Sequence, residues 1–210
     1  TGKAGLGAGG GGGSNHSDST AVGAEALYNI TTGDYNVAVG SQAGNDLTTG
    51  TGNTLVGGLS GDALLAAADN VAVGYLSLST ETGGQNNVAV GPYALQNQVN
   101  SSGNIYNTAV GSQAGNDVTT GAYNTIMGGL AGDALTTSDY NTAVGYLALS
   151  ADTLGANNTA IGSAALMTQN FTTATNSYNV AVGLNAGLLV TTGIWNTFVG
   201  SLAGDALIDA

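Results

Sequence analysis

The sequence predicts an all-β protein, a parallel β-solenoid of about eleven 17-residue coils. Three observations predict it: a five-residue motif that recurs eleven times, a mostly constant interval of 17 residues, and a content of 36 glycines in 210 residues. Repeats at a short fixed period are typical of solenoids, in which each unit packs only on its neighbours. Frequent Gly and Thr, without a 3.6-residue apolar stripe, argue against helices.

The motif consists of Asn, then Thr or Val, then Ala or a larger apolar residue, then Val, Ile or Met, and finally Gly. Ser19 opens a slightly altered first copy. Such a run is typical of a short strand that ends in a tight bend, so we expect two short strands and two turns in each coil. The other ten copies begin at Asn36, Asn53, Asn70, Asn87, Asn107, Asn124, Asn141, Asn158, Asn179 and Asn196.

A longer period of 71 residues lies above the first. Gly40–Asp46 returns as Gly111–Asp117, and Gly57–Leu64 returns with one change as Gly128–Leu135. Each 71-residue block holds four coils and one long corner, which indicates block duplication. We therefore expect a Gly-rich leader over residues 1–18 and a solenoid domain over residues 19–210.

The fourth position of the motif is apolar in every copy, and we expect it to form the core column. The third position, mostly Ala, would then face outward, because side chains alternate along a strand. A small apolar column on the outside indicates packing against other copies of the chain. The residues of the expected core column are Val22, Val39, Val56, Val73, Val90, Val110, Met127, Val144, Ile161, Val182 and Val199.

Further round the coil, the ninth and twelfth positions vary together. Where the ninth is Gly, as at Gly44, the twelfth is a large aliphatic residue, here Leu47; where the ninth is Leu78, the twelfth is Glu81. We interpret this as an exchange of volume inside one narrow core, from which the coil of Leu27 departs.

Two polar or small columns complete the motif. We expect the Asn column to be structural, with amides that bond along the axis or tie down the preceding turn. The closing Gly indicates a positive φ or a close approach of two backbones.

The composition excludes several functions. One Lys, no Arg and a net charge of −12 rule out phosphate-neutralising nucleic-acid binding and adsorption to anionic membranes. The lack of Cys excludes disulfides and thiolate metal sites. No apolar run approaches the length of a membrane span, so we expect no membrane insertion.

Candidate chemistry is sparse, and we expect no enzyme, no catalytic residue, no cofactor and no metal site. His16 is the only His and has no second base or nucleophile nearby. Gly5–Gly10 matches the letters of a dinucleotide fingerprint without its strand and helix. Asn45-Asp46 and Asn116-Asp117 are the nearest approach to Ca²⁺ ligands.

Six aromatic residues directly precede the motif and are our candidates for contact with a partner or glycan. Two interpretations stand: a ladder that stiffens the solenoid, which we favour, or a row on which sugars stack. These residues are Tyr35, Tyr106, Tyr123, Tyr140, Tyr178 and Trp195.

A Thr column near the second turn supports an alternative function, ice binding by a β-solenoid. Leu65 and Ile208 interrupt this column. Its members are Thr31, Thr48, Thr82, Thr119, Thr136, Thr153 and Thr191.

The repeated Asn-Thr/Val-Ala-Val/Ile-Gly motif resembles the head repeat of YadA-like trimeric adhesins, which is also found in phage tail-fibre-type proteins. The resemblance covers residues 19–210, and the 17-residue coil is longer than that of the usual adhesin repeat. It implies a left-handed β-roll, a side-by-side homotrimer and an extracellular place, in a virion fibre or on a bacterial cell surface.

We therefore predict a non-enzymatic structural fibre or adhesin segment, a stiff oligomeric rod for attachment or receptor display. Its partner would be a host-surface glycan or protein receptor. The long corners, Gln96–Tyr106 and Met167–Tyr178, are the expected places of contact, because insertions there leave the core untouched.

Overall fold

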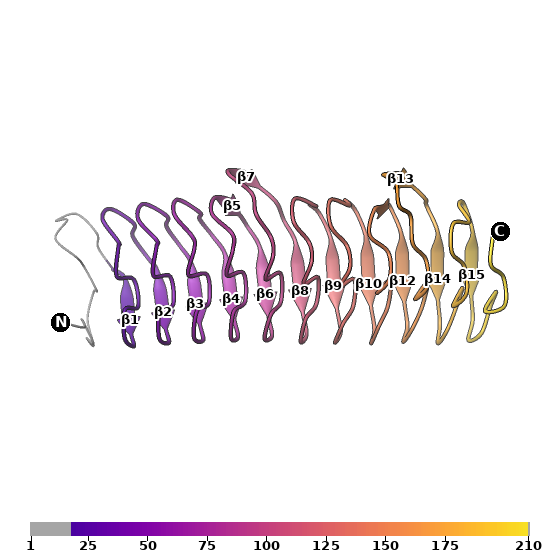
Figure 1. Ribbon diagram of the computed structural model, residues 1–210. Helices are drawn as coiled ribbons and strands as arrows, with labels where there is room; N and C mark the ends of the chain where they lie inside the picture. Colours follow the sequence, from indigo (N-terminus) through magenta and orange to yellow (C-terminus); the bar gives the residue numbers. More distant parts are fainter. Residues whose placement is uncertain (1–17, 210) are drawn as a thin grey trace. The chain divides into compact units, whose positions relative to one another are not determined.

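The computed structural model describes residues 18–209, and over that range the chain is all β, with no helix. It is a parallel β-solenoid of about eleven coils, roughly 17 residues apart, which confirms the predicted fold class (Figure 1). The chain divides into two compact units, residues 1–106 and 107–210. Residues 1–17 of the expected leader, including His16 and Gly5–Gly10, lie outside the described residues.

The first unit contains five three-residue strands. Within this unit, each strand pairs in parallel with the strand of the next coil. Val37 lies opposite Thr54, for example, and Val71 lies opposite Val88. Two short strands, β5 and β7, form a second small parallel sheet at the long corner (Figure 1). The strands are β1 (Thr20–Val22), β2 (Val37–Val39), β3 (Thr54–Val56), β4 (Val71–Val73), β5 (Gly84–Gln85), β6 (Val88–Val90) and β7 (Gly103–Asn104).

The second unit repeats this plan with six three-residue strands. The pairing stays in register across the longer corner, where Thr159 lies opposite Val180 although 21 residues separate them. β11 and β13 form the matching small sheet at this corner. The strands are β8 (Thr108–Val110), β9 (Thr125–Met127), β10 (Thr142–Val144), β11 (Gly155–Ala156), β12 (Thr159–Ile161), β13 (Thr175–Asn176), β14 (Val180–Val182) and β15 (Thr197–Val199).

Most coils hold one strand rather than the two that we expected. In the described part of the chain, a second strand occurs only at the long corners and the coils beside them, as β5, β7, β11 and β13. The rest of each coil is turn, because residues with positive φ recur in it and interrupt the extended backbone. Neighbouring coils still bond there, as when Leu27 N donates to Ala43 O and Thr31 N donates to Thr48 O.

The third position of the motif, not the fourth, faces the core. In every three-residue strand the central residue is buried and its two neighbours are exposed or half-buried. Ala38 is fully buried, whereas Val39 is 37% exposed and Val199 is 70% exposed. Our prediction of a core column at the fourth position and an outward third position is therefore wrong. The reason is space: one narrow coil accommodates Ala at this position, with Leu55 and Ile126 as larger fillers.

The exchange of volume between the ninth and twelfth positions is present in some coils, where the twelfth residue fills the space of a ninth-position side chain, as Leu64 does at Gly61 and Leu135 at Gly132. A Cβ added to Gly44 would lie 2.7 Å from Leu55 Cδ1 and 3.0 Å from Leu27 Cδ2, so aliphatic side chains already fill the space. In the second unit, a Cβ on Gly132 would lie 2.9 Å from Leu135 Cδ1. At Gly44 these two neighbours, Leu55 and Leu27, are not the twelfth residue, and in the coil of Leu27 the twelfth residue, Ile30, is fully buried beside the ninth.

The Asn column makes both kinds of bond that the sequence left open. Asn53 is fully buried, and its Nδ2 donates to Asn36 Oδ1 at 3.0 Å, one coil back. The same Nδ2 donates to Ala67 O at 2.8 Å and so fastens a turn. Asn36 Oδ1 also accepts from Asn53 N at 3.0 Å. Buried amides with bonds in both directions join neighbouring coils without leaving a polar group unsatisfied.

The closing Gly of the motif has a φ between +124° and +145° in all eleven copies. Backbones also approach closely here, since a Cβ on Gly111 would lie 2.5 Å from Gly128 O in the next coil. Both reasons that the sequence offered for this glycine are therefore present.

Candidate interaction surfaces

The six predicted aromatic residues form an exposed column at the turn before the strand. Their exposed fractions run from 41% for Tyr178 to 69% for Trp195. Some rings stack on each other: Tyr123 lies 5.0 Å from Tyr140 with the rings 3° from parallel, and Tyr178 lies 4.5 Å from Trp195. The column therefore contains stacked pairs and still presents ring surface to solvent.

The backbone at this column is left-handed in every coil. Tyr35 has a φ of 59° and Trp195 one of 63°, the same conformation as Gly52 and Asn86 in other coils. Gly, Asn and Asp adopt it readily, whereas an aromatic residue there costs roughly 1–2 kcal/mol. Backbone preference therefore does not account for six aromatic residues at this position. We attribute their presence to what the rings do, namely to stack on each other and to present surface to solvent.

A buried carboxylate at the twelfth position organises each long corner. In the first unit, Glu81 is fully buried, and its Oε1 accepts from the backbone N–H of Thr82, Gly84 and Asn100 at 2.8–3.0 Å. Its Oε2 accepts from Gln98 Nε2 at 2.7 Å. The carboxylate thus ties the coil to the long corner that follows it.

Asp152 does the same in the second unit. Its Oδ1 accepts from Gly155 N at 2.9 Å and Phe171 N at 3.1 Å, and its Oδ2 accepts from Gln169 Nε2 at 2.6 Å. Gln169 Oε1 in turn accepts from Asn179 Nδ2 of the Asn column at 2.8 Å. Burial raises the pKa of Asp152 above its ordinary value, against the opposing effect of these hydrogen bonds. The sequence showed both carboxylates at core positions but not their role.

Two other carboxyl groups lie close to a second Asp. Burial raises the pKa of Asp62 and of Asp133, and the nearby Asp46 and Asp117 add to the shift. One oxygen of Asp62 and one of Asp133 are buried without a hydrogen bond. Over residues 18–209, no three His, Cys, Asp or Glu side chains gather closely enough to hold a metal ion.

The Thr column forms internal hydrogen bonds. Thr48 Oγ1 donates to Leu65 O at 2.8 Å, and Thr136 Oγ1 donates to Thr153 O at 3.0 Å. The hydroxyls of all seven predicted members donate to a backbone carbonyl of the next coil. These hydroxyls support the coil stack, so ice binding through this column is not part of our proposal.

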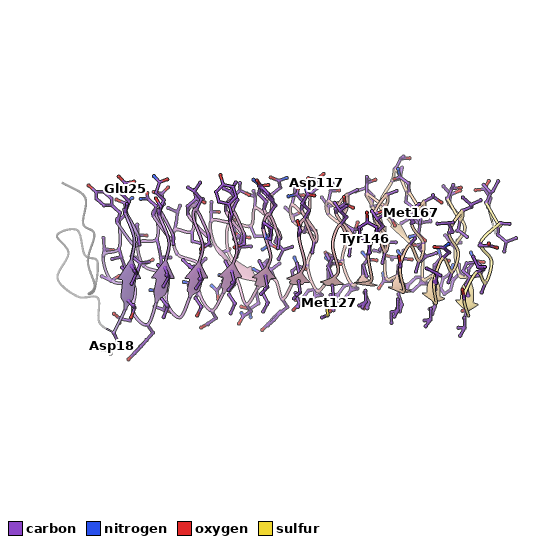
Figure 2. The ribbon with its side chains drawn as sticks, turned by 90° about the horizontal axis from the view of Figure 1, so that it is seen from below. Asp18, Glu25, Asp117, Met127, Tyr146 and Met167 are labelled. Atoms are coloured by element: carbon purple, nitrogen blue, oxygen red, sulfur yellow. The ribbon has the colours of Figure 1, made fainter. Side chains whose placement is uncertain are left out.

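The second and fourth positions of the motif form the surface that we call the strand face. Every coil places two residues there, one Thr or Val and one Val, Ile or Met, and none is buried. Met127 is 43% exposed and points outward from β9, as Figure 2 shows. No strand in the described part of the chain contains a charged residue. The strand face is an uncharged and largely apolar surface in each unit.

Comparison with protein-family models, with curated proteins and with solved structures gives no match to this chain. The resemblance to YadA-like head repeats thus remains a prediction. No helix within the described range is long and apolar enough to cross a membrane.

Proposed function

We propose that this chain is a non-enzymatic structural segment of an extracellular fibre or adhesin, in which copies of the chain associate through their strand faces. The trimer, the place in a virion fibre or on a bacterial surface, and the glycan or protein receptor are parts of this proposal. The observation that carries it is the strand face, which recurs in every coil.

Charge distribution supports association through this face. The chain has 13 acidic residues and one Lys, yet none of the acidic residues within residues 18–209 lies in a strand. Exposed β-branched side chains gain from burial at roughly 25 cal/mol per Å², and no charge has to be desolvated when two strand faces meet. Association through an uncharged face also leaves the exposed acidic residues outside the interface.

The long corners and the aromatic column support attachment as the role of the assembly. The corner before β14 adds a small sheet without changing the register of β12 and β14. Its loops can therefore change while the core remains the same, as is usual for recognition loops on a rigid scaffold.

The proposal predicts that the purified chain is an oligomer in sedimentation equilibrium, with three copies for the YadA-like arrangement. Val144→Lys places a charge on the strand face of β10 and is expected to dissociate it, because a buried ammonium without a partner is strongly unfavourable. Tyr146→Lys is the matched control: it adds the same charge two residues further on, at a site that is 57% exposed.

A chain that remains monomeric at all concentrations would contradict the proposal. The same holds if Val144→Lys, shown by circular dichroism to be folded, assembles as well as Tyr146→Lys does.

A further inference from the structure

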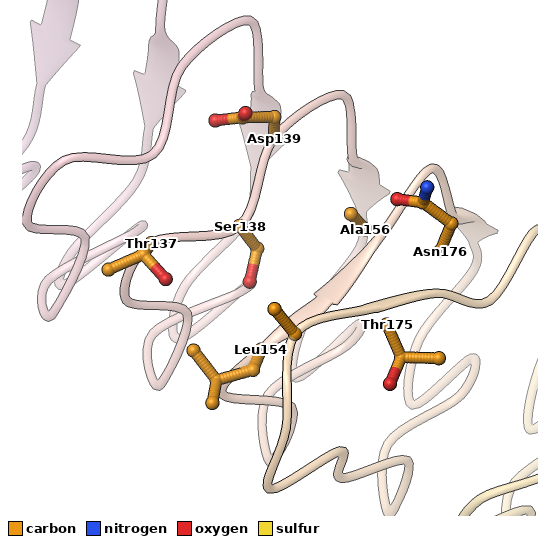
Figure 3. A pocket seen from close by; sticks show the side chains of 8 residues that line it. Thr137, Ser138, Asp139, Leu154, Ala156, Thr175 and Asn176 are labelled. Carbon is orange, nitrogen blue, oxygen red and sulfur yellow. The ribbon is translucent and has the colours of Figure 1, made fainter.

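The second unit contains a cleft of about 280 Å³ under its long corner. Three consecutive coils line it, each contributing residues from the segment before its aromatic-column position. Figure 3 shows Thr137, Ser138 and Asp139 on one side, and Thr175 and Asn176 of β13 on the other. Leu154, Ala156 and Ala174 complete the lining. The volume lies near the lower end of the range for small-molecule sites, which begins at about 300 Å³.

The lining combines hydrogen-bonding groups on two walls with apolar groups between them. The Thr137 hydroxyl forms no hydrogen bond among the described residues, and Asp139 uses only Oδ1, which accepts from Ala122 N at 2.7 Å. Asn176 uses only Oδ1, which accepts from Asn157 Nδ2 at 3.0 Å, so its own Nδ2 remains a donor. Ser138 Oγ donates to Thr153 O and can still accept.

This set of groups suits a ligand with both hydroxyls and an apolar face. The unused oxygen of Asp139 accepts from a hydroxyl, and Asn176 Nδ2 donates to one. Leu154 and Ala156 offer an apolar patch for C–H groups. A pyranose ring has this combination of hydroxyl groups and an apolar C–H face.

The charge of the lining favours neutral over acidic sugars. The lining contains one carboxylate and no cation, in a chain whose net charge is −12. An acidic sugar would be repelled by Asp139 and would find no Arg or Lys. A cation would find a single carboxylate, fewer than the several oxygen ligands that Ca²⁺ takes.

The first unit provides an internal comparison. A shift by one 71-residue block aligns Thr137, Ser138 and Asp139 with three alanines, residues 66–68. Asn176 of β13 corresponds to Asn104 of β7, which lies at the same place in the shorter corner. The blocks agree in their core motifs but differ where the cleft has its polar wall. That wall is therefore not required by the coil architecture.

We propose that this cleft binds one neutral pyranose residue of a glycan, with Asp139 and Asn176 as its hydrogen-bonding partners. The proposal rests on the attachment role given above and names the ligand class of that role.

Titration of the ¹⁵N-labelled chain with methyl glycosides tests it. The probes are the methyl glycosides of glucose, galactose, mannose and N-acetylglucosamine, with methyl glucuronide as the acidic counterpart of the glucoside. At least one neutral glycoside is expected to shift the amide signals of Ser138, Thr175 and Asn176 with a millimolar Kd, and the glucuronide is expected to bind more weakly.

Three variants separate the cleft from its surroundings. Asp139→Ala reproduces the residue of the first unit, and Asn176→Ala removes the donor; each is expected to weaken binding about tenfold or more. Asn104→Ala makes the same change at the first corner and is expected to leave binding unchanged. Binding by none of the neutral glycosides, undiminished binding by Asp139→Ala, or equal binding of the glucuronide would overturn the proposal.

Measurement of the oligomeric state in the same samples keeps the two proposals apart. An oligomer without sugar-dependent shifts overturns the cleft proposal alone. A monomer that shows the shifts overturns the assembly proposal and leaves the cleft proposal standing.

Discussion

Left-handed backbone at residues other than Gly, in three columns of the coil, is the main feature of this solenoid at the scale of the residue. Within residues 18–209, the 26 non-glycine residues with positive φ fall in the seventh, the ninth and the last position of the coil, and they include Gln42, Leu59 and Leu78. Each costs free energy in isolation. Hydrogen bonds between coils offset this cost at the seventh position, where Gln42 N donates to Ala24 O at 2.7 Å.

The closing Gly of the motif allows a sharp test at this scale. Gly128→Ala places a Cβ 2.5 Å from Gly145 O, at a φ of +136°, and backbone cannot move aside without opening the coil stack. We expect a loss of about 3 kcal/mol in the free energy of unfolding, measured by urea titration. Gly129→Ala is the control, because its Cβ would meet only Tyr146 Cδ2 at 3.7 Å. A loss of the same size in both variants would contradict this explanation.

At the scale of the element, a three-residue strand could be read from the sequence, but not the direction in which it faces. The motif located all the long strands, such as β2 at Val37–Val39. The alternation of side chains along a strand allows either the third or the fourth position to face the core. The larger side chain of Val39 favoured the fourth position, which is wrong. What decides is the small interior, which the rest of the coil encloses and where Ala38 fits.

The surfaces differ in how far the sequence revealed them. The aromatic column was visible because its members precede the motif at a fixed distance, as Tyr123 and Tyr140 do. The cleft was not, because it depends on how Thr175 and Asn176 of the corner lie beside Ser138 two coils earlier. A loop of irregular length has no period from which such a juxtaposition can be inferred.

The buried carboxylate of the second long corner makes stability depend on pH. Because burial raises the pKa of Asp152, the folded chain binds more protons than the unfolded chain between pH 3.8 and the raised value. The free energy of unfolding therefore falls as the pH rises through this window. Asp62 and Asp133, whose pKa values are also raised, act in the same direction.

Urea titrations at a series of pH values from about 3.8 upward measure this slope. Asp152→Asn is expected to make the fall smaller, because the amide cannot ionise, although it weakens the corner at every pH. Asp18→Asn, at an exposed site, removes the same charge and is the control. A slope in Asp152→Asn as steep as in the parent chain would show that this carboxyl group is not responsible.

At the scale of the whole molecule, each coil depends on its immediate neighbours and on little else. The second unit is built from strand pairs one coil apart, such as β9 with β10, and from the Asn column that joins the same coils. Stability in such an architecture is close to a sum of coil and interface contributions. The number of coils can therefore change without loss of the fold, whereas the residue type at each position within a coil is constrained.

Deletion of one complete coil tests this independence. Removal of residues 125–141 joins Asn124 to Thr142 and restores the motif, so every remaining column keeps its place. We expect the shortened chain to fold with the same far-UV circular dichroism per residue and a modestly lower melting temperature. Removal of residues 125–132 instead joins Asn124 to Asp133 and eliminates a strand, its closing Gly and the eighth-position Ala131. Since that deletion leaves a gap in the strand pairing, in the closing-Gly column and in the core column of the stack, we expect it to melt far below the longer deletion. If it melts higher, the coil is not the unit from which this protein is built.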